Sequence, residues 1–418
     1  MSTRSYVTQR QVAEEARVSR TTVSLVLNQV PDASIGAETR QRVLEAARRL
    51  DYYPDAAARR LASGKTRTIA LVWHRAPDHT YRDAFLPGLL DGISRAARRY
   101  GYQVLFRPVE VDEPNGSYME LVRGRHTDGL ILSGPRSDDD LLLALRAEGF
   151  PVVLHGCLHG VDIPSVDVDN VRGAAAAVHH LLALGHRRVG MITNAPLVYA
   201  ASGQRLEGYR RALQAADIPY DETLVREGNF DEESGYAAIM DLMVLDHPPT
   251  AVFVASDMVA MGALRALHEE GMCVPGEVAV VGFDDITAAR FITPALTTVH
   301  VPTFGLGWSA AELLIEIVEQ GSGEHSHVQL GTELIVRESC GADAAQNDWP
   351  VCWRVVNDSR QGRETMVRLN RFKSSHLEPS LQNRYVLHEA CDDTGRCPRS
   401  QGLAGYGLTG HQRQPSGQ

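Results

Sequence analysis

The chain of 418 residues contains no apolar run long enough to cross a membrane, since a spanning helix needs about 20 such residues. Between Met1 and Asn28 it also lacks the apolar stretch of a secretory signal peptide. We therefore expect a cytoplasmic protein with no membrane partner. In that reducing compartment its six cysteines should remain free thiols without a disulfide framework.

The motifs of the common enzyme classes are missing as well. No Gly-rich phosphate-binding loop is followed by Lys and Ser or Thr, no nucleophile elbow is present, and no residues have metal-ligand spacing. The sixteen histidines are scattered, and the adjacent pair His179 and His180 would point in different directions on a helix. We therefore expect no catalytic residues, no cofactor and no metal site.

Within residues 8–28 the chain has the pattern of two short helices joined by a tight turn. Thr8 and Gln11 have the spacing of a capping box, which marks the start of the first helix. Ser19 is a candidate N-cap of the second helix, in which apolar residues recur at helical spacing from Val23 onward. This arrangement is typical of a helix-turn-helix.

The outward-facing residues of the second helix suit a contact with DNA. Arg20, Thr21 and Leu25 lie near its N-terminal end and outside the apolar stripe. At such positions an Arg side chain reaches the acceptor edge of guanine, and small or apolar groups contact the thymine methyl. The alternative is an ordinary helical hairpin whose polar residues are only solvated.

A third amphipathic helix is predicted over residues 37–50, and a short fourth one follows it. Pro54 permits a helix to start and Gly64 permits it to end, so the segment between them predicts a helix of about two and a half turns. Alone, such a helix is marginal in water. We expect it to fold only when DNA and a partner copy hold it.

Charge is divided unevenly along the chain. Residues 1–65 hold 11 Lys and Arg against 7 Asp and Glu, a balance of +4, whereas the whole chain is at −10. A basic head on an acidic body is expected when one end neutralises DNA phosphates and the remainder does not.

From Thr68 onward, short β-rich runs alternate with stretches of helical length, in two successive series. This alternation predicts βαβ units, with parallel sheets covered by helices on both faces. Two consecutive α/β units of this size enclose a cleft. The predicted strands of the first series are 68–73, 103–106, 129–132 and 152–154, and those of the second are 188–193, 251–255 and 278–282.

From about Val7 to about Ser339 the sequence resembles the lactose-repressor (LacI) family of bacterial transcription regulators. The family's opening pattern is present as Val12-Ala13, Val18-Ser19, Thr22-Val23-Ser24, Val26-Leu27-Asn28, Tyr53-Pro54 and Ala58-Arg59-Arg60-Leu61. The resemblance implies an all-α helix-turn-helix domain at 1–53 and a hinge helix with its linker at 54–66. It further implies a two-lobed, periplasmic-binding-protein-like α/β core at 67–341, which binds a small effector and mediates dimerisation.

The resemblance also implies which residues meet DNA. Leu61 would be the wedge that two subunits insert side by side into the minor groove at the centre of a palindromic operator. A Leu elsewhere would simply be core, but this one follows two arginines. The residues expected to contact the operator are Thr8, Ser19, Arg20, Thr21, Thr22, Ser24, Leu25, Asn28, Arg59 and Leu61.

In open α/β sheets, ligands bind beyond the carboxyl ends of the strands. Asp284 follows such a strand directly, in the family's Gly-Phe-Asp-Asp pattern, where a carboxylate accepts hydroxyl groups of a sugar-like ligand. Its neighbour Asp285 is equally suited to form a turn or a cap. Arg205 matches a family residue placed over the effector, and its guanidinium offers a rigid fork to ligand oxygens. A surface arginine at a helix start is the alternative.

Other candidates for the cleft are weaker. Ser256 occupies a position where relatives carry a ligand-binding Asn, so a different or water-mediated contact is expected, and Asp257 should cap the following helix. Trp73 and Phe85 would stack on a sugar face or pack within the first lobe, while Asp169 and Asn170 would bind a ligand or cap a helix. The first-lobe candidates are His74, Phe85, Ser133 and His155.

Residues 342–418 depart from the family pattern, because the chains of family members end soon after a strand like the one at 330–339. The extension has no clear periodicity and is rich in Arg, Gln, Ser and Gly, so we expect a disordered tail. Cys391 and Cys397 are spaced more widely than a zinc knuckle requires. Two origins remain open: a shifted or extended reading frame, and a genuine partner-binding segment.

These observations favour a sequence-specific regulator, a repressor, that binds double-stranded operator DNA. We expect a homodimer, with a tetramer as the alternative, whose operator affinity is controlled allosterically by a carbohydrate or a sugar derivative between the lobes. Whether the effector releases the operator or promotes its binding is open. The rival hypothesis is a solute-binding receptor that uses the same two-lobed core without DNA regulation.

Overall fold

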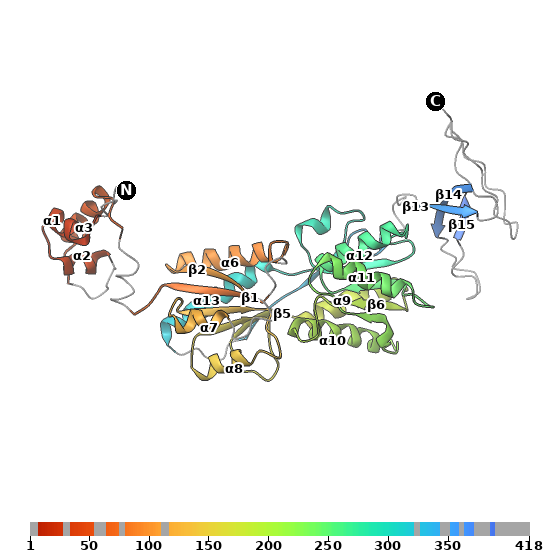
Figure 1. The fold of residues 1–418 in the computed structure, drawn as a ribbon, viewed down its shortest axis with the longest axis horizontal. Helices are drawn as coiled ribbons and strands as arrows, with labels where there is room; N and C mark the ends of the chain where they lie inside the picture. The colour runs from red at the N-terminus through yellow and green to blue at the C-terminus, as the bar shows by residue number, and fades with distance from the viewer. Residues whose placement is uncertain are drawn as a thin grey trace, which may run out of the picture.

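Three parts follow one another along the chain: a helical head, an α/β core with two six-stranded sheets, and a small three-stranded sheet (Figure 1). The residues described by the computed structural model are 7–27, 34–53, 64–74, 80–109, 117–321 and 327–342, together with three strands between 352 and 388.

The head consists of α1 (Gln9–Ala16), α2 (Arg20–Leu27) and α3 (Ala37–Arg49). Both predicted capping positions make their bonds. The side-chain oxygen of Gln11 accepts the Thr8 backbone N–H at 2.7 Å, and the Ser19 hydroxyl accepts the Thr22 backbone N–H at 3.0 Å. The small core that joins the three helices is formed by Val12, Ala13, Ala16, Val23, Val26, Val43, Ala46 and Ala47.

The outer surface of α2 agrees with the helix-turn-helix interpretation. Arg20 and Thr21 are exposed, and Leu25 is half-buried. Asn28 and the predicted hinge helix, with Arg59 and Leu61, lie outside the described residues. The contacts of all these residues with DNA remain predictions.

Lobe one is built on an entirely parallel sheet with the strand order β11-β5-β4-β3-β1-β2. Continuous apolar runs form its central strands, as expected for a sheet that is covered on both faces. Its strands are β1 (Thr68–His74), β2 (Gln103–Val109), β3 (Gly129–Ser133), β4 (Val152–His155), β5 (Ser165–Val168) and β11 (His327–Leu330).

Alternate residues of β1 face the two helical layers of lobe one. Ile69 and Leu71 pack in one cluster with α6 (Leu86–Arg99) and α13 (Thr303–Gln320). The intervening Ala70 and Val72 pack on the opposite face with α7 (Ser117–Arg123) and α8 (Asp140–Ala147). The period of two along a strand therefore gives lobe one its three layers.

Lobe two repeats this plan with the strand order β12-β10-β9-β8-β6-β7, in which only β12 runs antiparallel to its neighbour. Helices α9 (Asn170–Ala183) and α10 (Ala200–Ala215) cover one face. Helices α11 (Glu232–Met243) and α12 (Asp257–Glu269) cover the other. The strands are β6 (Val189–Ile192), β7 (Val225–Arg226), β8 (Ala251–Val254), β9 (Ala279–Asp284), β10 (Thr297–His300) and β12 (Glu333–Ile335).

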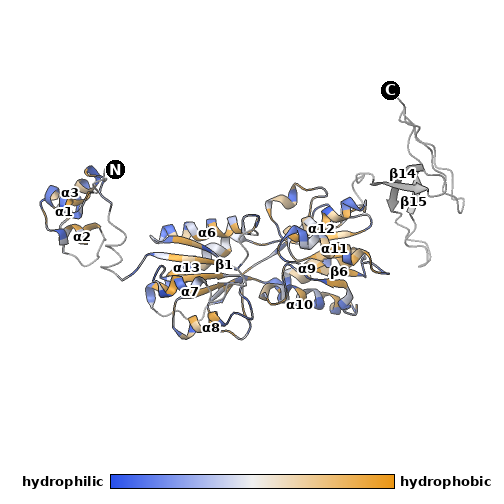
Figure 2. Cartoon of the chain, viewed as in Figure 1, coloured by the Kyte–Doolittle hydropathy of each residue, from blue (hydrophilic) through white to orange (hydrophobic). Residues whose placement is uncertain are grey.

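The chain passes between the two lobes three times: from β5 to α9, from β10 to α13 and from β11 to β12. In Figure 2 the strands of both sheets are mainly hydrophobic, while the outer sides of the covering helices carry hydrophilic residues. One buried cluster includes residues of both lobes, each lobe has a second buried cluster on its other face, and short connections join the two lobes. Such an architecture permits hinge motion of one lobe against the other.

The segment expected to be disordered contains a three-stranded antiparallel sheet formed by β13 (Cys352–Asp358), β14 (Arg363–Arg371) and β15 (Tyr385–His388). The sequences of β13 and β14 include Val, Trp and Thr, which favour extended backbone. No helix in the described part of the chain is long and apolar enough to span a membrane. Cys157 and Cys340 are free thiols, but Cys273 is disulfide-bonded, contrary to expectation for that residue.

Candidate effector-binding cleft between the lobes

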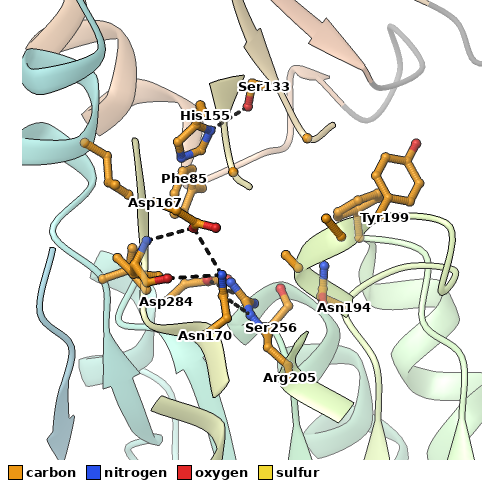
Figure 3. A pocket seen from close by; sticks show the side chains of 18 of the residues that line it. Phe85, Ser133, His155, Asp167, Asn170, Asn194, Tyr199, Arg205, Ser256 and Asp284 are labelled. Carbon is orange, nitrogen blue, oxygen red and sulfur yellow. Dashed lines mark hydrogen bonds and ion pairs between the residues drawn. The ribbon is translucent and has the colours of Figure 1, made fainter. Parts of the chain in front are cut away.

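A cavity of about 840 Å³, part of it open to solvent, lies where the strand ends of the two lobes meet. Figure 3 shows polar side chains from both lobes turned toward it. Of the seven residues predicted to bind an effector, six line this cavity: Phe85, Ser133, His155, Arg205, Ser256 and Asp284.

Arg205 is the centre of the polar network in the cleft. It lies in the first half of α10 and is 8% exposed, so it is not the surface arginine of the alternative. Its Nε donates to the Asn170 side-chain oxygen at 2.9 Å, and its Nη1 donates to the Ala255 carbonyl at 2.6 Å. The guanidinium also lies 3.8 Å from the centre of the Phe283 ring. These contacts fix the plane of the guanidinium before any ligand arrives.

Asp284 ends β9 beside this guanidinium. Its Oδ1 lies 3.6 Å from Nη1 of Arg205, and its φ of 122° is a conformation that residues other than glycine rarely adopt. The next residue, Asp285, has a structural role, because its carboxylate pairs with Arg337 and, at 3.0 Å, with Nδ1 of His300. Asp285 therefore ties β9 to its neighbours, while Asp284 faces the cavity.

Asp167 and Asn170 also line the cavity, although the prediction included no role for Asp167 and left that of Asn170 open. The Asn170 amide donates to Asp167 Oδ1 at 3.1 Å and to the Gln204 side-chain oxygen at 2.9 Å. Burial raises the pKa of Asp167 to about 6, although the Val168 N–H and the charge of Arg205 favour its carboxylate form. No strand was predicted over residues 165–168, where the structure has β5, so the strand-end signal that pointed to Asp284 did not point to Asp167.

Asp257 has a role that differs from the expected helix cap. Ser256 occupies the N-cap position of α12, while the Asp257 carboxylate accepts the Thr298 hydroxyl at 2.6 Å and the Ile286 N–H at 3.0 Å. Asp257 is completely buried and lies behind the cavity wall. Burial, and after it the charge of Asp284, raise the pKa of Asp257 above its usual range. The Asp257 side chain therefore bonds to two distant segments of the chain instead of capping its own helix.

Lobe one contributes aromatic rings and one hydrogen-bonded pair. Trp73 and Phe85 line the cavity, and the Phe85 ring lies 5.6 Å from the His155 ring. The Ser133 hydroxyl and His155 Nδ1 are 2.8 Å apart, which fixes the orientation of the imidazole. The apolar faces of the Trp73 and Phe85 rings suit the carbon faces of a sugar ring.

His74 is not among the residues that line the cavity. It ends β1, and its ring makes an edge contact with Tyr118 at 5.8 Å. Its Nε2 lies 3.8 Å from the Asp139 carboxylate. Burial lowers the pKa of His74. The side chain therefore packs within lobe one, whereas its predecessor Trp73 faces the cleft, as the alternation along a strand requires.

The cavity also has lining residues that were not predicted, among them Asn194, Tyr199 and Phe230. They follow β6 or precede helices of lobe two, in loops without a distinctive sequence motif. Among the described residues, no group of three or more His, Cys, Asp or Glu side chains is arranged to hold a metal ion. The residues that line the cleft offer hydrogen bonds, charge and aromatic faces to a polar organic molecule.

Comparison with known proteins agrees with both halves of this architecture. Residues 8–55 match the family described as bacterial regulatory proteins, lacI family, and residues 178–340 match the periplasmic binding protein-like domain. The chain is 38% identical over 347 residues to the HTH-type transcriptional regulator CelR of Thermobifida fusca, across 81% of this chain and 100% of that protein. The chain belongs to the LacI family.

Solved structures of family members have the same fold. The transcriptional regulator CelR in complex with cellobiose has a TM-score of 0.63 at 35% identity, over 80% of this chain and 99% of that one. The lac repressor dimer bound to operator and the anti-inducer ONPF has a TM-score of 0.70 at 28% identity, over 80% and 99%. This LacI-family protein is a transcriptional regulator, and the family is not one of enzymes.

Proposed function

We propose that this regulator is a repressor that binds a palindromic operator as a homodimer and responds to cellobiose or a closely related β-linked glucose disaccharide. The observation that carries the proposal is the convergence of Arg205, Asp284 and Asn170 with the aromatic side chains Trp73 and Phe85 in one cleft between the lobes. Carboxylates, amides and guanidinium groups suit sugar hydroxyls, and aromatic faces suit sugar rings.

The choice of sugar is supported by the likeness to CelR, whose structure is a complex with cellobiose. A neutral disaccharide also fits the charges of the cleft. Arg205 is already paired with the carboxylate of Asp284 at 3.6 Å, and Asp167 is a further acidic group in the cavity. A ligand with its own phosphate or carboxylate would meet these two acidic side chains at close range.

The proposed DNA contacts rest on the head. The exposed N-terminal part of α2, with Arg20 and Thr21, suits the major groove. A lac repressor dimer bound to its operator is among the similar structures. A monomer with a head balance of +4 neutralises few phosphates, so two heads on two half-sites are expected for specific affinity. In this proposal Arg59 and the wedge residue Leu61 contact the minor groove between the half-sites.

The proposed regulation uses the two-lobed core. A sugar held by both lobes favours one relative position of the lobes, and this changes the distance between the two hinge segments of a dimer. By reciprocity, the sugar changes the free energy of operator binding by the same amount as the operator changes the free energy of sugar binding.

The test is binding of the purified chain to labelled DNA from upstream of its own gene, with and without cellobiose, at a stated salt concentration. We expect protection of a palindrome of about 16–20 base pairs and a change of at least tenfold in affinity when cellobiose is added. Glucose and sucrose serve as control sugars. Protection that no sugar alters would contradict the proposed effector, and an absence of protection together with tight cellobiose binding would favour a solute receptor.

A further inference from the structure

Apart from the three crossings of the chain, a noncovalent contact joins the two lobes on the Tyr199 side of the cavity. Arg136, after β3 of lobe one, forms an antiparallel bridge with Tyr199, just before α10 of lobe two. The Ser137 N–H donates to the Val198 carbonyl at 3.0 Å, and the Ala200 N–H donates to the Pro135 carbonyl at 3.3 Å. We call residues 135–137 with 198–200 the interlobe latch.

Side chains strengthen the backbone pairing of the latch. The Arg136 guanidinium lies 5.1 Å from the centre of the Tyr199 ring and donates to its hydroxyl at 3.5 Å. It is held in this position by two bonds to Asp138, at 2.8 and 2.7 Å. On its other side the Tyr199 ring makes an edge contact with Phe230 at 4.9 Å, and its hydroxyl donates to the His74 carbonyl at 3.4 Å. Tyr199 is therefore anchored to both lobes.

The latch is also a wall of the effector cavity. Pro135 and Tyr199 line the cavity, while Arg136 does not. Figure 3 shows Tyr199 on the opposite side of the cavity from Asp167 and Asp284. A ligand that binds at Arg205 and extends in this direction meets the Tyr199 ring. It can continue only if the two backbone hydrogen bonds of the latch break.

We infer that the interlobe latch determines effector length: the closed latch accepts a sugar that fits inside the cavity and excludes longer oligosaccharides of the same linkage. Arg136 is a positioning residue that acts through Tyr199. The inference rests on the proposed response to cellobiose, and it adds a structural basis for discrimination by length.

The first test compares cellobiose with cellotetraose by titration of the intrinsic tryptophan fluorescence, to which Trp73 in the cavity wall contributes. The wild type should bind cellobiose at least tenfold more tightly than cellotetraose. In Arg136→Ala the ratio of the two Kd values should narrow by about 5-fold, because a cation–π contact of this kind is worth about 1 kcal/mol. Thermal unfolding should show that the variant is folded.

Arg82→Ala is the matched control. Arg82 also contacts the other lobe, through Glu233 at 3.1 Å, but both side chains are mostly exposed, so this ion pair should contribute little and the Kd ratio should stay unchanged. The inference would be overturned if the ratio of the Kd values for cellotetraose and cellobiose were the same in Arg136→Ala as in the wild type and in Arg82→Ala.

The second test does not depend on the identity of the sugar. Residues 136 and 199 are a non-hydrogen-bonded antiparallel pair, whose Cα atoms are about 4.5 Å apart in regular geometry, within reach of a disulfide. The double variant Arg136→Cys with Tyr199→Cys should therefore form this disulfide in the absence of ligand, whereas neither single variant should. Absence of the cross-link would mean that the latch is open in solution and would overturn the inference.

The oxidised double variant also separates the two proposals. With the latch locked, the oxidised protein should bind cellotetraose at least tenfold more weakly than cellobiose, and equal binding of the two sugars would count against the inference alone. If the wild type binds no cellobiose while the cross-link forms, the proposed effector is wrong and the closed latch stands.

Discussion

The two lobes contribute different chemistry to the same cleft. Lobe two supplies a polar network that is complete without a ligand: Arg205 is bonded to Asn170 and Ala255 and lies 3.6 Å from Asp284. Lobe one supplies the rings of Trp73 and Phe85 to the cavity wall, and lobe two adds those of Tyr199 and Phe230. We propose that lobe two fixes the orientation of the effector through these preorganised groups, while lobe one adds contact area when the lobes close.

Besides Asp83, another acidic residue of lobe one lines the cavity and departs from this division: Asp167. It lies in β5 of lobe one, yet it is bonded to Asn170, the first residue of α9 in lobe two. This is the first of the three connections between the lobes. The polar network is therefore linked directly to a hinge segment, which offers a route by which occupancy of the cleft affects the lobe arrangement.

The largest effect is expected from Arg205→Ala. Removal of the guanidinium leaves Asp284 and Asn170 with buried polar groups that have lost a partner, and truncation of such a pair costs about 2–5 kcal/mol. Cellobiose affinity, measured by calorimetry, should fall by at least 100-fold, and the Tm should fall as well. Arg210→Ala is the control, because Arg210 lies in the same helix but is exposed. A loss of less than tenfold would show that lobe two does not dominate binding.

The Asp167→Asn variant tests the buried carboxyl of Asp167 through the pH dependence of protein stability. The folded-state pKa of about 6 lies above the ordinary value of 3.8, so the protonated carboxyl stabilises the fold. This contribution is fully present below about pH 4 and is lost as the pH rises through about 6. The stability of the wild type relative to Asp167→Asn should therefore fall between pH 4 and pH 7, by up to about 3 kcal/mol. Thermal unfolding at several pH values measures this, and parallel curves for the two proteins would contradict it.

Phe85→Ala tests lobe one. Loss of one stacking ring should weaken cellobiose binding about tenfold, or about 1.4 kcal/mol, with a smaller change in Tm than Arg205→Ala gives. Tyr81→Ala is the matched control, because Tyr81 lies four positions earlier in the sequence and is 89% exposed. If the effect of Phe85→Ala exceeds that of Arg205→Ala, the proposed division between the lobes is reversed.

The smallest effect is expected from Ser256→Ala. Ser256 lines the cavity, but its side chain is short and makes no capping bond to α12. A water-mediated contact with the sugar should contribute less than about 1 kcal/mol, so the cellobiose Kd should change by less than about fivefold. A larger change in the Kd, detected in the same titration, would indicate that the Ser256 hydroxyl bonds directly to the sugar as part of the polar network in lobe two.

Much of the architecture could be predicted because its signals are local. The caps at Thr8 and Ser19 depend on residues three positions apart. The strands of the core could be predicted from short apolar runs, because residues on both faces of each sheet are buried under helices. Asp284 and Arg205 were placed at the cleft because of family motifs. Strand ends also predicted Ser133 and His155 as neighbours of the cavity.

The misplaced residues have a common physical cause. His74 was predicted from its position at a strand end, but the direction of a side chain depends on which face of the strand it occupies, and Trp73 occupies the cleft side. Asp257 was expected to cap its own helix, yet it bonds to Thr298 and Ile286 from distant segments. Such contacts cannot be read from neighbouring residues in the sequence.

The sequence by itself determined the helix-turn-helix head, the two series of α/β units and the family, because capping, periodicity and short motifs act over a few residues. The tertiary structure decided which polar side chains meet in one cleft, that Asp167 joins them, and that residues 135–137 pair with 198–200 across the two lobes. The physical reason is that Asn170, Arg205 and Asp284, like the two segments of the latch, are separated by tens of residues along the chain. Only the packing of helices and sheets brings them into contact.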